Sequence, residues 1–479
     1  MKKLYSSFFK SNIIKNVSSI VGATLVAQII GVVILPLLSR IYSPAEFGVL
    51  SVYTSVVSIL TMFTGLRYYL AVPLPKHKRY ALALFYVTLV AHVAFAVLLL
   101  LLAFCGGSYF LEKFRLSSLQ PYLYLIPLGV FTTGLYTIVT QWAVREGFFY
   151  TIGLTRIVQA LSGNVTKLAM GFAGYKPIGL LLGAIIAQSC GSSTIIKRSL
   201  RDIPLIHVSR TDIKRVIVKY RNFPLYDMWT AVINVVGQNM PQLFLSFYYS
   251  LNTVGLYTMA ASLLSLPISL VGSAIGQVFV QRGAQAKYEG TLSDFSRKSY
   301  KIMLTLSIYP IGLISLLGPS LFSFFLGRQW SESGMYAIML FPRVAYSMTY
   351  GPICILYAIS DKIKDSFYHE ILLTIVMLVG LYLGNVFKNP LVAVLVYSVL
   401  SLIVMMLRMT YILNVVGIKV TEIFGMTFSV FIETAFLLFI PAFILLFSMP
   451  MLFLMLSAFI SAVAYLTLNY YKFRKEGIV

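Results

Sequence analysis

The sequence has 479 residues, of which 59% are hydrophobic and only 11% are charged, and its mean hydropathy is +0.86. Soluble chains carry about 25% charged residues. The composition therefore excludes a soluble globular protein and predicts an all-α polytopic membrane protein with almost no separate soluble domain. The formal net charge of +23 arises from Lys and Arg in short loops between apolar runs. That distribution is the one the positive-inside rule describes, and it argues against nucleic-acid binding.

Apolar runs long enough to cross roughly 30 Å of hydrocarbon occur fourteen times. The expected spans cover approximately 17–38, 48–70, 81–104, 122–143, 151–172, 178–196, 223–247, 255–280, 300–325, 334–357, 368–387, 390–413, 424–447 and 451–471. The basic stretch before the first span lacks the features of a cleaved signal peptide, so we expect this span to be permanent. The least distinct boundary is at Lys388 and Asn389, where Pro390 favours a turn.

The basic residues indicate the orientation. An even number of spans places both termini on the same side of the membrane. With the loops assigned alternately, 27 of the 38 Lys and Arg residues lie on the side of the N-terminus, six lie on the other side and five lie within spans. This excess predicts that both termini are cytoplasmic.

The spans group into two six-helix lobes, residues 1–197 and 223–413, followed by two extra transmembrane helices and a tail in 414–479. A weak internal repeat supports the grouping, because Tyr42-Ser43 followed by Gly48 matches Tyr249-Ser250 followed by Gly255 at an offset of 207 residues. Each copy joins the first and second spans of a lobe, which predicts a parallel pseudo-repeat.

The linker 198–222 between the lobes combines basic and apolar residues. Ile213, Val216, Ile217 and Tyr220 recur at helical spacing among Lys and Arg. This pattern predicts an amphipathic helix that lies on the anionic cytoplasmic leaflet, or else a solvated linker.

Polar residues inside spans are costly and are therefore the candidate functional residues. In the seventh span they fall within about 80° of one another on one helical face, and they are Asp227, Asn234, Gln238 and Gln242. Such a face contacts protein or a wet cavity. In the fifth span one face carries Arg156, Gln159, Gly163 and Lys167. Arg156 and Lys167 lie about 16 Å apart along the helix and suggest a path for an anion.

Arg67 in the second span and Arg343 in the tenth are further cations within spans. Several of these residues have simpler explanations. Arg67 and Lys167 can extend to the headgroups, and Asp227 can pair with Arg221 or another base. The amides of the seventh span can join helices. Arg156 and Arg343 are the hardest to explain this way, because apolar turns flank each of them.

No motif for catalysis or metal binding occurs in the sequence. Its cysteines, Cys105, Cys190 and Cys354, lie far apart, and the four histidines are scattered. Paired carboxylates, GxSxG, HExxH and the nucleotide-binding loop GxxxxGK[ST] are all missing. We therefore expect no enzyme activity, no cofactor, no metal and no direct use of ATP.

Two stretches carry a resemblance to a known family. They are LPLLSRIYSPAEFGVLSVYTSVVSIL (35–60) with LRYYLAVPLPK (66–76), and NFPLYDMWTAVINVVGQNMPQLFLSFYYSLNTVGLYTMAASLLSLP (222–267) with VGSAIGQVFVQRGA (271–284). In order and spacing they resemble the two halves of the Wzx-like polysaccharide flippases, within the multidrug/oligosaccharidyl-lipid/polysaccharide superfamily. One departure is Tyr69, where the family often has an acidic residue after Arg-Tyr.

The resemblance implies two lobes around a central cavity that works by alternating access in the bacterial inner membrane. Its implied substrate is an undecaprenyl-pyrophosphate-linked repeat unit of O-antigen or another surface polysaccharide, such as that of lipopolysaccharide. The substrate's pyrophosphate would suit the cavity cations Arg67, Arg156, Lys167 and Arg343. Implied partners are membrane lipids, the polysaccharide polymerase and the chain-length machinery.

Two other functions remain open. A multidrug or other small-molecule exporter of the same superfamily would favour an acidic cavity, and the buried Arg and Lys residues argue against it. A membrane-embedded glycan polymerase or ligase would be expected to carry a large outer loop with charged catalytic residues. The longest outer loop here covers only about 105–121.

Overall fold

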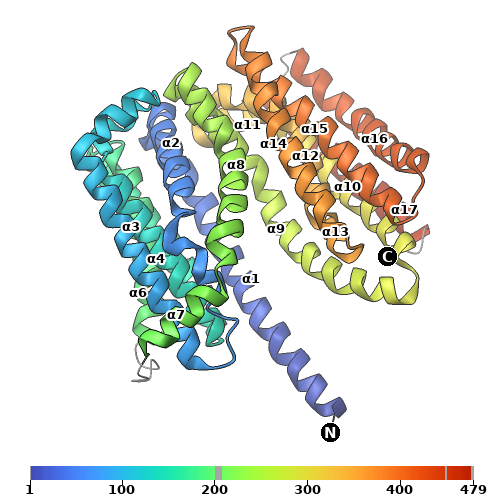
Figure 1. Cartoon of the computed structure of the whole chain (residues 1–479). Coiled ribbons are helices and arrows are strands. Elements are labelled where there is room, and N and C mark those ends of the chain that lie inside the picture. The colour runs from blue at the N-terminus through green and yellow to red at the C-terminus, as the bar shows by residue number, and fades with distance from the viewer. Residues whose placement is uncertain (1, 200–207, 448–449, 476–479) are drawn as a thin grey trace. The chain divides into compact units, whose positions relative to one another are not determined.

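The structure, a computed structural model, describes residues 2–199, 208–447 and 450–475, and these residues form helices and turns without a β-strand (Figure 1). The α-helices are α1 (Lys2–Ile41), α2 (Pro44–Thr61), α3 (Lys78–Lys113), α4 (Leu125–Arg145), α5 (Phe149–Phe172), α6 (Ile178–Ser199), α7 (Arg210–Lys219), α8 (Met228–Tyr248), α9 (Leu251–Glu289), α10 (Leu292–Leu316), α11 (Gly318–Leu326), α12 (Ser331–Ile353), α13 (Leu356–Ile359), α14 (Ile363–Asn385), α15 (Pro390–Val415), α16 (Val420–Leu446) and α17 (Met451–Lys475). The predicted all-α polytopic class is confirmed.

The expected spans can be compared with these helices one by one. Among the described residues, three of the seventeen α-helices are short (α7, α11 and α13), and each of the other fourteen has 18 residues or more. Each expected span coincides with one of these fourteen. Nine of them, within the same described ranges, are long and apolar enough to cross a membrane by length and composition alone.

Three expected spans are interrupted within the described residues. The second, expected at 48–70, ends as an α-helix at Thr61 and continues into the irregular segment η1 (Thr64–Ala71). The ninth, expected at 300–325, ends at Leu316, and a new helix starts at Gly318 with Pro319 in its first turn. Proline has no backbone N–H to donate to the preceding turn, so it is favoured where a helix begins. The tenth, expected at 334–357, ends as α12 at Ile353 and resumes as α13 at Leu356.

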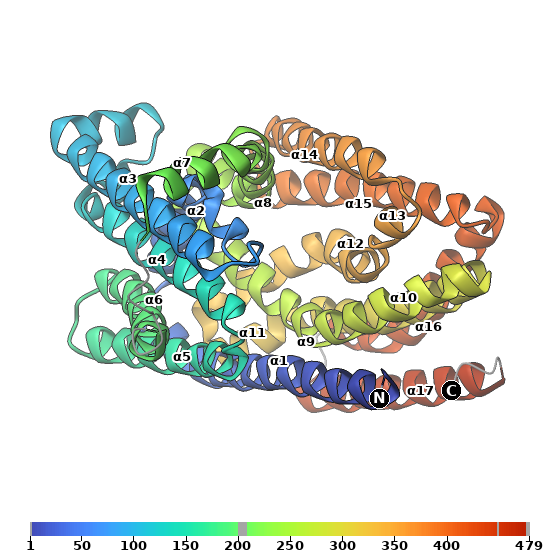
Figure 2. The ribbon, with the colours of Figure 1, turned by 60° about the horizontal axis from the view of Figure 1, so that its bottom comes forward.

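The chain divides into two compact units, Met1–Gly255 and Leu256–Val479. In the first unit α5 packs between α1 and α6, and α4 contacts α2, α3 and α6 (Figure 2). In the second unit α12 packs against α10 and α15, α14 lies along α15, and α16 packs against α17. The boundary falls at Gly255, after α8, whereas the sequence places the lobe boundary before residue 223, because α8 packs against α2.

The two copies of the internal repeat contact each other within the first unit. A Cβ atom on Gly48 would lie 1.9 Å from the carbonyl oxygen of Leu251, and one on Gly255 would lie 1.8 Å from that of Pro44. The contact is reciprocal, because 44 and 251 differ by the same 207 residues as 48 and 255. This backbone-to-backbone approach requires glycine at both positions. The reciprocal contact between equivalent positions of the two copies supports the pseudo-repeat, and it could not be predicted from the sequence alone.

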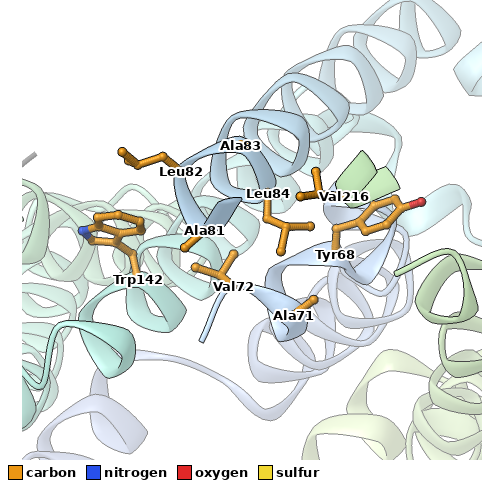
Figure 3. Close-up of a cluster of buried hydrophobic side chains, with 9 residues drawn as sticks. All are labelled: Tyr68, Ala71, Val72, Ala81, Leu82, Ala83, Leu84, Trp142 and Val216. Atoms are coloured by element: carbon orange, nitrogen blue, oxygen red, sulfur yellow. The ribbon is translucent and has the colours of Figure 1, made fainter. Parts of the chain in front are cut away.

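The amphipathic helix of the linker forms as α7, after residues 200–207, which lie outside the described residues. Ser209 and Asp212 form a capping box that starts it. Val216 is 2% exposed and packs into an apolar cluster with η1, α3 and α4 (Figure 3). Ile213 and Tyr220 pack against the same cluster. Protein side chains therefore pack against Ile213, Val216 and Tyr220 of this apolar face, whereas Ile217 is 38% exposed.

Candidate functional site

Arg67 lies where the second span loses its helical conformation. Gly65, Leu66 and Arg67 have φ angles of 54°, 50° and 60°, all in the left-handed region. Two of these residues carry a Cβ, and each such conformation costs about 1–3 kcal/mol unless the surroundings impose it. Thr88 of α3 lies directly against Gly65, where a Cβ would approach its Cγ2 to 2.4 Å. The packing of α3 therefore holds a strained turn that directs Arg67 away from the regular helix.

Arg67 forms an ion pair with Asp227, which is 160 residues away in the sequence. The Nε–Oδ2 distance is 2.7 Å, and the side chains are 15% and 42% exposed. The Nη1 of Arg67 also donates to the Tyr69 hydroxyl at 3.1 Å. Two predicted site residues thus meet, and Arg67, not Arg221, is the partner of Asp227. The carboxylate missing at position 69 is supplied by Asp227.

Asp227 ends the π-helical turn η3 (Phe223–Asp227) that precedes α8. Such turns are rare and often occur at functional sites. Along α8, Gln238 Nε2 donates to Asn234 Oδ1 at 2.7 Å, so these two amides bond to each other on one helix instead of joining two helices. In the described part of the chain, the buried Gln242 Oε1 has no partner. The face expected from sequence therefore offers an unsatisfied amide oxygen, Gln242 Oε1, which can accept a hydrogen bond from a hydroxyl.

The fifth span carries a second group of predicted residues. Arg156 is exposed, with its guanidinium 5.9 Å from the ring centre of Tyr136. Gln159 Nε2 donates to Gln188 Oε1 of α6 at 3.1 Å. Lys167 lies over Gly183, where a Cβ would meet its Cγ at 2.4 Å. Among the described residues, neither Arg156 nor Lys167 has a carboxylate within ion-pair distance, so α5 carries two cations available to an anion.

Arg343 lies in α12 of the second unit. Its guanidinium is 5.1 Å from the ring centre of Tyr397 in α15, and its backbone N–H donates to Ser398 Oγ at 3.2 Å. Its buried Nε has no partner among the described residues. The nine predicted residues therefore fall into three groups: η1 with α8, α5 with α6, and Arg343 in the second unit.

An additional buried cation, Arg408 of α15, was not singled out from the sequence. It is 2% exposed, and its Nη2 lies 2.9 Å from Glu370 Oε2 of α14. Its guanidinium also lies 4.7 Å from the ring centre of Tyr350. The sequence contains a feature that could have identified Arg408. It is the fifth Lys or Arg within the expected spans, and Glu370 lies at the start of the neighbouring expected span.

The sequence alone suggests no role for Glu433 of α16. In the structure its carboxylate has two polar partners on α17. Lys472 Nζ lies 2.5 Å from its Oε2, and Asn469 Nδ2 donates to its Oε1 at 3.2 Å. Glu433 therefore links α16 to α17. Within the described ranges no group of three or more His, Cys, Asp or Glu side chains could hold a metal ion, and Cys105, Cys190 and Cys354 are free thiols.

Comparison with solved structures identifies the fold. The inward closed conformation of the lipid II flippase MurJ matches with a TM-score of 0.72 and 14% identity, covering 95% of this chain and 98% of that one. An inward-facing multidrug resistance MATE family transporter of the MOP superfamily matches with a TM-score of 0.53 and 13% identity, covering 82% and 95%. At these identities the likeness establishes that this chain shares the fold of those two proteins.

Comparison of sequences identifies the family. The succinoglycan biosynthesis transport protein ExoT of Rhizobium meliloti (strain 1021) is 24% identical over 315 residues, which are 62% of this chain and 59% of that protein. The chain thus spans about three fifths of the length of this relative. The family described as "Polysaccharide biosynthesis protein" matches residues 37–334. Because that match covers more than half of the sequence, the chain belongs to this polysaccharide biosynthesis family.

Proposed function

We propose that this protein is a flippase that moves undecaprenyl-pyrophosphate-linked oligosaccharide repeat units from the cytoplasmic to the outer leaflet by alternating access. The repeat unit would belong to O-antigen or another surface polysaccharide. The membership in a polysaccharide biosynthesis family and the MOP transporter fold support this proposal. Both termini would be cytoplasmic, in agreement with the charge distribution of the loops.

The observation that carries the proposal is the pair of cations on α5. Neither Arg156 nor Lys167 has an acidic partner among the described residues, although a cation within a transmembrane helix is costly. A diphosphate would offset that cost, because its oxygens accept charge-assisted hydrogen bonds. A guanidinium can bind them in a bidentate manner, which an ammonium cannot. The unsatisfied Gln242 Oε1 of α8 adds an acceptor for a sugar hydroxyl.

The test is complementation of a deletion strain. Deletion should abolish the surface glycan and cause the lipid-linked repeat unit to accumulate. Arg156→Ala should reduce complementation by about 10- to 100-fold, the worth of one hydrogen bond to a charged group, and Arg156→Lys should reduce it less. Arg40→Ala provides a matched control, because Arg40 is exposed at the end of α1.

Protein levels in the membrane must be equal for all variants. Full complementation by Arg156→Ala would contradict the role of Arg156. A deletion strain that keeps its surface glycan but becomes sensitive to toxic cations would favour a small-molecule exporter.

A further inference from the structure

A cavity of about 620 Å³ lies between α7 and the segment that leads from η1 into α3. Lys76, His77 and Tyr80 line one side of it, and Arg215, Lys219 and Tyr220 line the other. The four basic side chains among these six are all exposed. The expected linker helix thus forms one wall of a basic cavity.

The basic side chains that line this cavity have no carboxylate partners in the described part of the chain, unlike the basic side chains of the two neighbouring residues. Neighbouring Lys78 pairs with Glu146 at 2.9 Å, and Arg79 pairs with Asp212 at 2.5 Å. In the described part of the chain, Lys76, His77, Arg215 and Lys219 have no carboxylate within ion-pair distance. Their nearest polar or aromatic neighbours are tyrosines. Arg215 Nη1 donates to the Tyr80 hydroxyl at 3.4 Å, and Lys219 lies 5.5 Å from the ring centre of Tyr220.

The cavity also has apolar surface at its edge. Leu74, which lines it, is 59% exposed. Val218 is outside the lining residues but lies on the same helix α7, and it is 55% exposed. Lys78 and Arg79 are the last charges before the long apolar run of α3, so the cavity lies at the end of a span, where lipid headgroups lie. Unpaired cations beside exposed apolar side chains match a ligand that has both a phosphate and an acyl chain.

We propose that this cavity binds the phosphate headgroup of an anionic phospholipid of the cytoplasmic leaflet. Basic pockets at the ends of spans on this side of the membrane bind such headgroups through unpaired Lys and Arg side chains. The proposal rests on the proposed orientation but not on the identity of the transported molecule.

The position of the cavity gives the lipid a structural consequence. Lys76 follows Arg67 on one chain segment, and Lys219 precedes Asp227 on the other. A headgroup that binds both walls therefore joins the two segments that present the Arg67–Asp227 ion pair. Bound lipid stabilises this pairing and the docking of α7.

Lipid binding to the purified full-length protein in detergent tests the proposal. Phosphatidylglycerol should raise the melting temperature and remain bound in native mass spectrometry, whereas phosphatidylcholine should do neither. The triple variant Lys76→Gln, Arg215→Gln and Lys219→Gln should weaken phosphatidylglycerol binding by on the order of 100-fold at low salt. A control with the same change in charge, Lys298→Gln, Lys364→Gln and Lys419→Gln, should bind normally, because these lysines lie on α10, α14 and at the start of α16.

Equal loss of binding in both triple variants would overturn the proposal in favour of general surface charge. Equal stabilisation by inorganic phosphate or pyrophosphate would also overturn it, because the ligand would then be a free anion. If the triple variant does not fold, Lys219→Gln alone should weaken phosphatidylglycerol binding about fivefold, since Lys219 is exposed on α7. Unchanged binding by this single variant would contradict the assignment. A flippase assay is not needed, so failure here is distinct from failure of the proposed function.

Discussion

Two ion pairs of this protein, Arg67–Asp227 and Arg408–Glu370, each join an arginine to a carboxylate, but their surroundings differ. Arg67–Asp227 joins two irregular segments of the first unit, one left-handed and one π-helical, at 2.7 Å. Arg408–Glu370 joins two regular helices of the second unit at 2.9 Å. Arg67 is 15% exposed and Arg408 is 2% exposed, whereas both carboxylates are 42% exposed. The first pair depends on two irregular segments, and the second depends on the packing of two regular helices. We therefore expect a transport role for the first pair and a structural role for the second.

The largest expected effect concerns the second pair. Glu370→Leu would leave the buried Arg408 without its acid and should lower the free energy of unfolding by about 3 kcal/mol. The double variant Glu370→Leu with Arg408→Met should recover most of this loss, because it removes both charges. Glu433→Leu is the control and should cost less than about 1 kcal/mol, because its partner Lys472 is 45% exposed. Thermal unfolding in detergent measures all three, and an undisturbed Glu370→Leu protein would refute the structural role.

The next largest effect is expected from a glycine substitution in the left-handed turn, compared with a glycine substitution in a regular helix. Gly65→Ala places a Cβ at a φ of 54° and 2.4 Å from Thr88 Cγ2, so it should destabilise the protein by about 1–3 kcal/mol and impair transport. Gly425→Ala lies in the helix α16, with nothing within 4 Å of the new Cβ. It should stabilise the protein by up to about 1 kcal/mol. Equal melting temperatures for the two variants would mean that the turn at Gly65 is not strained.

A smaller change in stability is expected when the first pair is broken. Asp227→Asn should lower the free energy of unfolding by no more than about 1 kcal/mol, since the pair is partly exposed. Transport, measured by surface-glycan complementation, should nevertheless fall at least about tenfold, because Arg67 loses its counter-charge. Glu146→Gln breaks the Lys78 pair in the same unit and should preserve transport. Normal complementation by Asp227→Asn would remove the distinction between the two pairs.

The smallest expected effect is that of low pH on the packing of α7 against the rest of the first unit. Burial raises the pKa of Asp212, but the hydrogen bonds from Ser209 and Arg79 and the charge of Arg79 outweigh it and hold this pKa below its ordinary value. The stabilisation is present above the unfolded-state pKa of about 3.9 and is lost as the pH falls through the lower folded-state pKa. Proteolysis at α7 should therefore increase only in strong acid, and Asp212→Asn should remove this dependence. Release of wild-type α7 already at neutral pH would disagree with this account.

The sequence by itself determined the fold class, the helices and the family. Long apolar runs cannot remain in water and must form their hydrogen bonds within one segment, so composition and length were sufficient to locate fourteen helices. In the structure, Ser43 and Ser209 cap the starts of α2 and α7 by local hydrogen bonds. The sequence also located Arg67, Arg156, Lys167 and Asp227, because an ionisable residue inside a span is conspicuous.

Only the tertiary structure decided which of these residues meet. Arg67 and Asp227 are 160 residues apart, and their pairing depends on a left-handed turn that Thr88 holds in place. Arg408 and Glu370 pair because α14 packs along α15. The apolar face of α7 suits lipid and protein equally well in sequence, and only the structure shows that Ile213, Val216 and Tyr220 pack against protein. The hydrophobic effect is non-directional, so local sequence patterns are enough to predict which segments are buried in the membrane. Ion pairs and close glycine contacts depend on interatomic distances, and only the packing of the helices sets these distances.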